Sequence, residues 1–156
     1  MNTVRSMAYA IFLLAVLTAG IHPLAASCLD AEEEQVVDAL RRFMVALKTD
    51  DMAAYSAVTT PDFHAFDMGY DMTADQLIGV VRNARESGVT LNWQVTEPRV
   101  RIDGTTAWIT YVNRGSIQKG TETNDVTWLE SAVLSKVDDS WRIQFVHSTP
   151  AAGPGE

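Results

Sequence analysis

The sequence predicts an α+β fold in which a curved antiparallel sheet wraps around helices that come first in the chain. Helical periodicity dominates the first half, and strand-like alternation replaces it from Val89 onward. Three long strands follow, joined by turn signals such as Asp103-Gly104 and Asp138-Asp139-Ser140. Helices grouped at one end of a chain and antiparallel strands at the other are typical of segregated α+β domains.

Residues 1–27 have the pattern of a secretory signal peptide. Arg5 precedes an apolar run over residues 8–19, and small residues precede Cys28. A membrane-spanning helix needs about 20 apolar residues, so an uncleaved anchor is the less favoured alternative. We therefore expect an exported protein, periplasmic or secreted, without a membrane span.

Cys28 is the only cysteine, so an internal disulfide cannot form. Its position directly after the leader indicates a bacterial lipoprotein acylated at Cys28, but the residues before it match that signal imperfectly. A plain exported protein is favoured, with lipid anchoring as the alternative. One domain is expected over residues 28–149, and a flexible tail over residues 150–156.

The mature chain is acidic. Loss of the leader leaves 11 basic against 20 acidic side chains, a formal charge of −9, and the basic residues are scattered. Such a surface repels phosphate backbones, so nucleic acid is not an expected partner. Only His64 and His147 remain as histidines, without ligands at zinc spacing, so no metal site is expected. The sequence also lacks a phosphate loop and a dinucleotide fingerprint, and no cofactor is expected.

Two long helices and one short helical piece are expected. Asp30 is a candidate cap for the first helix, whose apolar stripe is expected to pack on the sheet. Asp50-Asp51 begin the short piece. Thr73 caps the second long helix, and Gly88 ends it.

Alternation locates the strands. A short strand is expected over residues 63–67, a bulge at Glu97-Pro98 in the next strand, and a polar loop over residues 119–125. The closing strand is interpreted with four side chains on one face: Trp141, Ile143, Phe145 and His147. An imidazole at the end of an apolar sheet face indicates a pocket with one polar group.

Several short motifs share an order and spacing with a known family. They are Phe43 to Asp50, Thr60-Pro61-Asp62-Phe63, Phe66-Asp67-Met68-Gly69, Val100 to Ile109, Trp141-Arg142-Ile143 and His147-Ser148. Over residues 31–149 the sequence resembles the SnoaL-like branch of the nuclear transport factor 2-like superfamily. The resemblance implies a cone-shaped fold, often dimeric through the outer sheet face, with a deep pocket between helices and sheet. Relatives include ketosteroid isomerase, scytalone dehydratase, polyketide cyclases and non-catalytic assembly domains, so the fold alone does not settle the activity.

His147 and Asp67 are the candidates for proton transfer. His147 can act as a general base, or it can bond a backbone carbonyl and close the pocket wall. The resemblance implies that Asp67 lies near the proton-transferring aspartate of ketosteroid isomerase, where an apolar wall of Phe63 and Phe66 would raise its pKa. A turn-forming role beside Gly69 is favoured instead, because that enzyme's tyrosine and second acid have no clear match.

Two aromatic side chains and one acid remain ambiguous. Tyr111 and Trp128 can present an OH and an NH to a ligand, or they can be core bulk. Glu130 shares parity with Trp128. Facing inward, it would be a buried acid that needs a partner such as Arg114; facing outward, it would be solvated.

The first functional hypothesis is an exported protein that binds a small, largely apolar molecule. Its ligand-binding candidates are Phe63, Phe66, Tyr111, Trp128 and His147.

Two alternatives stand beside it. One is a cofactor-independent isomerase, dehydratase or cyclase in which Asp67 and His147 exchange protons. The other is an interaction domain that dimerises through the open sheet face, where Trp108 and Val112 are expected. Binding ranks above catalysis because the acid/base set looks incomplete.

Overall fold

The computed structural model describes residues 29–152. The predicted signal peptide, Cys28 and the tail residues 153–156 lie outside the described residues. Helices and strands alternate only at the start of the chain, and long strands fill its second half. The helices are α1 (Ala31–Thr49), α2 (Met52–Val58) and α3 (Ala74–Glu86). The strands are β1 (Thr59–Asp67), β2 (Tyr70–Thr73), β3 (Val89–Asp103), β4 (Thr106–Lys119), β5 (Glu122–Val137) and β6 (Ser140–Pro150).

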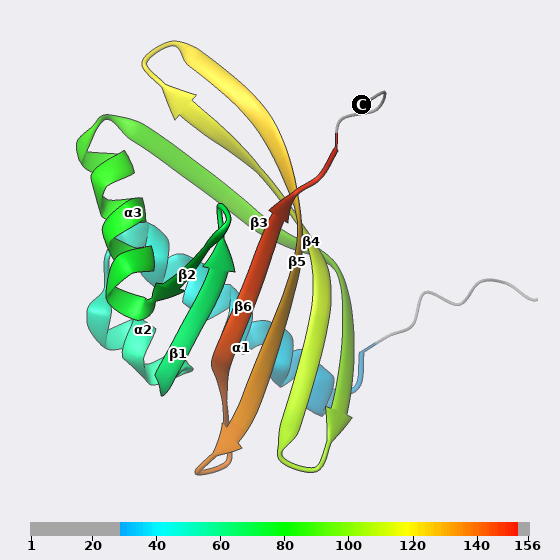
Figure 1. Cartoon of the computed structure of the whole chain (residues 1–156). Coiled ribbons are helices and arrows are strands. Elements are labelled where there is room, and N and C mark those ends of the chain that lie inside the picture. The colour runs from blue at the N-terminus through cyan, green and yellow to red at the C-terminus, as the bar shows by residue number, and fades with distance from the viewer. Residues whose placement is uncertain (1–28, 153–156) are drawn as a thin grey trace, which may run out of the picture.

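The strands form one curved sheet in the order β2-β1-β6-β5-β4-β3. Figure 1 shows α1 crossing behind this sheet and α3 standing beside β1 and β2. The predicted α+β class is therefore confirmed. One strand pair differs from the expected antiparallel pattern, because β1 and β6 run parallel. These strands are far apart in the chain and meet through long connections, which permit parallel pairing where a hairpin does not.

The helix predictions are confirmed. The Asp30 carboxylate accepts from the backbone N–H groups of Glu32 (2.9 Å) and Glu33 (2.8 Å), which caps α1. Thr73 and Gln76 form the same reciprocal arrangement at the start of α3. The apolar stripe of α1 is buried against the sheet: Val36, Val37, Ala39, Leu40, Phe43, Ala46 and Leu47.

An ion-pair cluster fixes α3 relative to α1. Asp50 ends α1 in the left-handed backbone region, with φ of 60°. Its carboxylate accepts from Arg82 and Arg85 of α3, each with a contact of 2.8 Å. The Arg82 hydrogen bond is the main reason that the pKa of Asp50 lies below its ordinary value. These ion pairs thereby hold α3 to the C-terminal end of α1.

The predicted bulge in β3 is confirmed. The β3–β4 register shifts between Thr96 and Arg99, and Glu97 takes φ of 54°. Because Pro98 cannot donate to the ladder, the irregularity falls where pairing is already interrupted. The apolar residues therefore change parity across this point, as the sequence pattern indicated.

A second bulge was not predicted, and it changes the interpretation of the closing strand. Ile143 pairs with Leu134 and Phe145 with Val133, so Gln144 is an extra residue in β6. Trp141 and Ile143 are buried, but beyond Gln144 the buried residue is Val146. The expectation that Phe145 and His147 share a face with Ile143 is therefore wrong.

Two further expectations about strands are corrected. The predicted loop over residues 119–125 is a tight hairpin in which Lys119 pairs with Glu122, and β5 starts there. Strand β2 was not predicted; it pairs with β1 through Asp67 and Tyr70. In both places backbone pairing with a neighbouring strand outweighs the polar composition. Within residues 29–152, no helix is both long and apolar enough to cross a membrane.

Two glycines give a matched test of the packing. At Gly115 an added Cβ would collide with the backbone carbonyl of Asn92 on β3, whereas at Gly79 in α3 it would meet open space. We expect Gly115→Ala to lower the free energy of unfolding by about 1–3 kcal/mol. Gly79→Ala should raise it by about 0.5–1 kcal/mol, because alanine favours helix. Urea denaturation measures both, and equal effects of the two variants would contradict this packing.

Candidate functional site

A partly enclosed cavity of about 380 Å³ lies between α1, α3 and the inner face of the sheet. This volume falls in the range of small-molecule sites. Most of its wall is apolar, and the polar members come from three central strands and the end of β1. The lining residues are Phe43, Met44, Leu47, Ala65, Asp67, Met68, Leu77, Val80, Val81, Ala84, Val89, Leu91, Trp93, Asn113, Ile117, Trp128, Glu130, Val146 and Ser148.

Strand register brings the polar side chains together. Tyr111 of β4 lies opposite Glu130 of β5, and Glu130 lies opposite Ser148 of β6. Residues that face each other across antiparallel strands project to the same side of the sheet. Asn113 and Trp128 form the next inward pair. The pairing therefore places Glu130 on the inner face, which parity alone left open.

Glu130 has side-chain partners on both neighbouring strands. The Ser148 hydroxyl donates to Oε1 at 2.7 Å, and the Asn113 amide donates to Oε2 at 3.3 Å. Arg114, the partner considered from the sequence, instead pairs with Glu97 at 2.6 Å outside the cavity. Burial raises the pKa of Glu130, and these hydrogen bonds together with Tyr111 oppose that rise.

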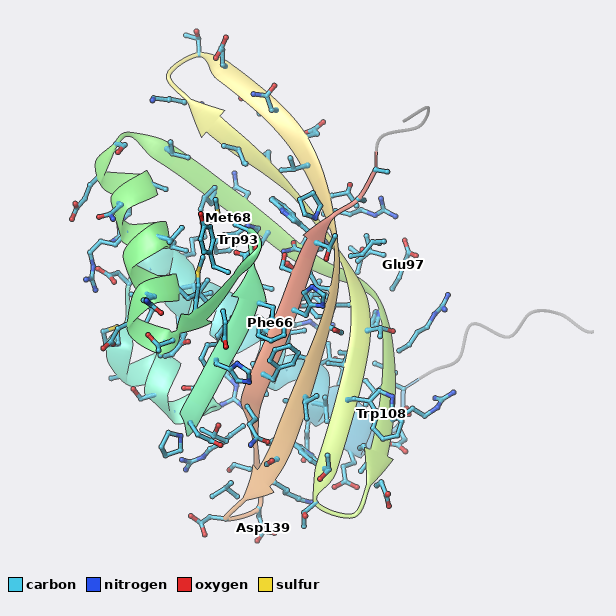
Figure 2. The ribbon with its side chains drawn as sticks, in the orientation of Figure 1. Phe66, Met68, Trp93, Glu97, Trp108 and Asp139 are labelled. Atoms are coloured by element: carbon cyan, nitrogen blue, oxygen red, sulfur yellow. The ribbon has the colours of Figure 1, made fainter. Side chains whose placement is uncertain are left out.

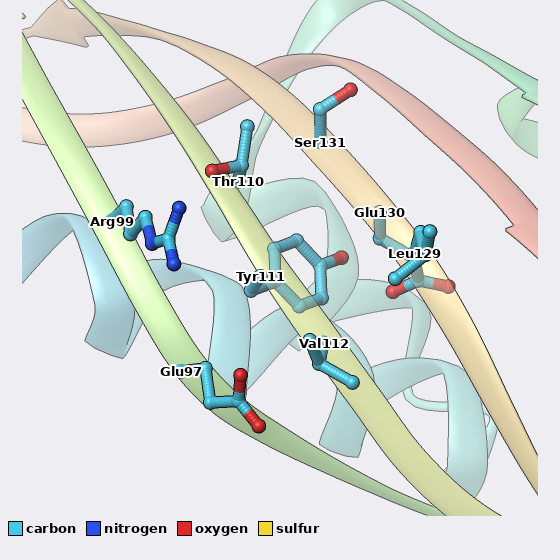
Figure 3. A pocket seen from close by; sticks show the side chains of 8 residues that line it. All are labelled: Glu97, Arg99, Thr110, Tyr111, Val112, Leu129, Glu130 and Ser131. Carbon is cyan, nitrogen blue, oxygen red and sulfur yellow. The ribbon is translucent and has the colours of Figure 1, made fainter. Parts of the chain in front are cut away.

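Tyr111 is almost fully buried, at 3% exposure. Figure 3 shows its hydroxyl pointing toward the Glu130 carboxyl from behind β4. The hydroxyl makes no hydrogen bond of standard geometry, yet it is near enough to lower the pKa of Glu130. Burial raises the pKa of Tyr111 itself well above its ordinary value. Tyr111 is therefore a neutral donor beside the acid.

Asp67 reaches the cavity from the end of β1 and also forms the turn. Its Oδ1 accepts from the Met68 backbone N–H at 2.9 Å, where Met68 has φ of 52°. Burial raises the pKa of Asp67. The turn-forming role and a place in the cavity wall are thus compatible. Asp67 and Glu130 also influence one another, since the Asp67 charge contributes to the raised pKa of Glu130.

Of the five ligand-binding residues proposed from the sequence, Trp128 lines the cavity, whereas Phe63, Phe66, Tyr111 and His147 do not. Phe63 is core, with its ring centroid 5.6 Å from those of both Phe43 and Tyr55. Phe66 and His147 lie on the outer face, where their ring centroids are 6.1 Å apart. Figure 2 shows Phe66 on the face turned away from α1. His147 faces outward because of the Gln144 bulge. Phe66 faces outward because side chains alternate along β1 and its neighbour Ala65 faces inward.

Sequence reasoning missed Asn113, Ser148 and Trp93 as site residues. Asn113 is 2% exposed, and its Oδ1 accepts from the Gln94 backbone N–H at 3.2 Å. Asn113 could have been predicted, because it lies two residues after Tyr111 in the same strand and therefore on the same face of the sheet. Ser148 could not have been predicted, because the face on which its side chain lies depends on the bulge at Gln144.

The outer face carries a second hollow, of about 410 Å³, over β3, β4 and β5 (Figure 3). Glu97, Arg99, Thr110 and Leu129 border it on the exposed side. It is open and polar, so it is a weaker candidate for a small-molecule site. Over residues 29–152, the side chains form no cluster of three or more metal-ligating groups.

Comparison with known proteins agrees with this architecture. A family model described as a SnoaL-like domain matches residues 36–153. The chain therefore belongs to the SnoaL-like domain family, within the nuclear transport factor 2-like superfamily. No curated protein matches the chain.

Solved structures show the same fold at low identity. An NTF2-like protein from Cytophaga hutchinsonii is 14% identical with a TM-score of 0.64, covering 79% of this chain and 100% of that one. A ketosteroid isomerase-like protein from Erwinia carotovora atroseptica is 17% identical with a TM-score of 0.63, covering 80% and 100%. A CaMKII hub from S. rosetta is 16% identical with a TM-score of 0.65, covering 80% and 100%. Likeness at this level establishes the fold alone.

The raised pKa of Glu130 predicts a pH-dependent stability. The folded protein binds a proton at this carboxyl more tightly than the unfolded chain does. This stabilises the fold fully below the ordinary glutamate pKa, and the contribution is lost as pH rises through the folded-state value. Glu130→Gln removes the titration. We therefore expect the unfolding free energy of this variant, relative to wild type, to increase from about pH 4 to about pH 7.

Urea denaturation across this pH range measures the difference. The control is Glu122→Gln, which makes the same charge change at an exposed position in the β4–β5 hairpin. The control curve should run parallel to that of wild type. A parallel curve for Glu130→Gln as well would show that the carboxyl is not perturbed.

Proposed function

We propose that the chain binds a small, largely apolar molecule in the cavity between α1, α3 and the sheet. The observation that carries this proposal is the confined polar cluster of Glu130, Asn113 and Ser148 inside an otherwise apolar wall. Apolar volume with a few convergent polar groups is the usual composition of a ligand site. The leader predicted over residues 1–27 makes export part of the same proposal.

The packing of the helices supports an open volume at this place. The Asp50 ion pairs hold α3 against the end of α1, and the cavity lies between these helices and the sheet. A cavity with apolar walls stabilises a bound molecule by removing its apolar surface from water, at roughly 25 cal/mol per Å². A polar end of the molecule would meet Glu130 and Asp67.

Catalysis is the second candidate, because two carboxyl groups with raised pKa values line one cavity. Such groups suit proton transfer near neutral pH. The candidate pair is then Asp67 and Glu130, with Tyr111 as a donor, in place of Asp67 and His147. An isomerase, dehydratase or cyclase turnover that survived Asp67→Asn unchanged would remove this candidate.

Dimerisation through the outer sheet face is supported by its exposed apolar side chains. Trp108 is 47% exposed, Leu129 56% and Phe66 43%. Figure 2 shows Trp108 and Phe66 on the same face of the sheet. Exposed apolar groups on an open sheet are typical of interaction surfaces. Binding in the cavity and dimerisation on the outer face are compatible because they use opposite sides of the sheet.

Filling the cavity tests the binding proposal. Ala84 lines the cavity from α3, so Ala84→Phe should weaken binding of a neutral probe, 1-naphthalenemethanol, by about tenfold or more. Isothermal titration calorimetry measures the affinity. The matched control is Ala53→Phe on the exposed surface of α2, which should bind as wild type does. Equal binding by Ala84→Phe and wild type would place the probe elsewhere.

A charge on the outer face tests dimerisation. We expect the wild-type protein to be a dimer and Leu129→Glu to dissociate it, because a carboxylate buried in an apolar interface lacks a partner. Sedimentation equilibrium measures the mass. The control is Val45→Glu, at an exposed position of α1 away from the sheet face, which should remain dimeric. A monomeric wild-type protein at high concentration removes the proposal.

A further inference from the structure

The charged side chains that line the cavity are all acidic. Asp67 and Glu130 line it, and no lysine, arginine or histidine does so within the described residues. The basic residues around it are engaged or displaced: Arg114 pairs with Glu97, and His147 lies on the outer face. Lys48 and Arg85 border an adjoining hollow, where Lys48 bonds Asn92 and Arg85 pairs with Asp50. The two acids therefore face a low-dielectric volume that contains no protein cation.

The hydrogen bonds around Glu130 favour an acceptor at this position. The Gln94 backbone N–H donates to the Asn113 Oδ1 at 3.2 Å, which fixes the orientation of the amide. Its NH₂ group must then face Glu130, where it donates to Oε2. The Ser148 hydroxyl approaches the other oxygen, Oε1. Donors directed at both oxygens suit a carboxylate, which only accepts.

The Tyr111 hydroxyl lies behind Glu130 and is not one of the groups that line the cavity. It is buried and makes no hydrogen bond of standard geometry, and it points toward the same carboxyl (Figure 3). Buried polar groups without partners are uncommon in native proteins.

The aromatic side chains of the cavity wall also favour a positively charged ligand group. Trp93 of β3 and Trp128 of β5 line the cavity together with Phe43 of α1. Aromatic faces attract cations, and tryptophan does so most strongly. Two acids and two indoles around one apolar volume are therefore complementary to a positive group and unfavourable for a negative one.

Resting on the proposed function, we propose that the polar end of the ligand is a protonated amine that pairs with Glu130 and Asp67. The apolar part of the molecule occupies the space between α1 and α3. The ammonium supplies the counter-charge that the cavity wall lacks, and it can donate to both carboxylates. The formal charge of −8 of the whole chain steers cations toward the protein in the same sense.

Three probes that share one ring system and differ in charge test the proposal. They are 1-naphthylmethylamine (cationic), 1-naphthalenemethanol (neutral) and 1-naphthaleneacetate (anionic). At neutral pH we expect the amine to bind about 10- to 100-fold more tightly than the alcohol, and the acetate to bind most weakly. Isothermal titration calorimetry with the mature protein gives the three affinities.

Substitutions of the two acids test whether the preference for the amine over the alcohol arises from this cavity. Glu130→Gln should bring the ratio of amine to alcohol affinity close to one, whereas the exposed control Glu122→Gln should leave the ratio unchanged. If Glu130→Gln does not fold, Asp67→Asn serves as the second variant and should lower the same ratio. An unchanged ratio in a folded variant of either site acid overturns the proposal.

The pH dependence gives a readout that needs no variant. The titratable groups facing Glu130 are Tyr111 of β4 and Asp67 of β1, and the charge of His147 on β6 acts on Asp67 by lowering its pKa. Helices α1 and α3 and strand β3 contribute apolar or aromatic lining residues, and β6 contributes Ser148. As pH falls and the acids are protonated, amine affinity should fall and alcohol affinity should stay constant. An amine affinity independent of pH overturns the amine assignment.

The outcomes separate the two proposals. If the alcohol binds as tightly as the amine, the cavity binds apolar molecules but does not select amines. If the acetate binds most tightly, the charge argument is wrong and the binding proposal stands. If none of the probes binds, the proposed function fails and the amine inference fails with it.

Discussion

At Gln144 the closing strand β6 contains one residue more than its partner β5, and every side chain beyond this point changes sides. Ile143 packs into the core, and Val146 and Ser148 take the inward positions that a regular strand would give to Phe145 and His147. The hydroxyl of Ser148 thereby reaches Glu130, and the imidazole is removed to the outer face. The chemistry of the cavity thus depends on one inserted residue.

The second constraint is the spacing between α1 and α3. Both helices cover the inner face of the sheet, and Asp50 joins their ends through Arg82 and Arg85. The apolar stripe of α1 fills the space over the central strands, whereas α3 stands beside β1 and β2 and leaves a volume between the helices. The partly buried acid Glu130 is tolerated there because Asn113 and Ser148 each donate to one of its oxygens. Among residues 29–152, no cationic side chain lines the cavity beside this acid.

The two faces of the sheet carry different kinds of side chain. The inner face carries the cavity and its acids, and the outer face carries Trp108, Leu129 and the aromatic group around Phe145. Ligand binding and association can therefore vary independently in such a fold. Likeness to an isomerase-like protein and to a hub at similar TM-scores agrees with one scaffold that serves several functions.

The sequence by itself determined the helices, their caps, the bulge at Glu97 and the α+β class, because these depend on local spacing and on the chemistry of neighbouring residues. It also located Asp67 and Trp128, which line the cavity. Only the tertiary structure decided that Glu130 faces inward, that Asn113 and Ser148 join it, and that Phe66 and His147 do not. The face of the sheet on which a side chain lies depends on the register of its strand. Register is set by pairing between distant segments, and one extra residue moves every side chain that follows to the opposite face.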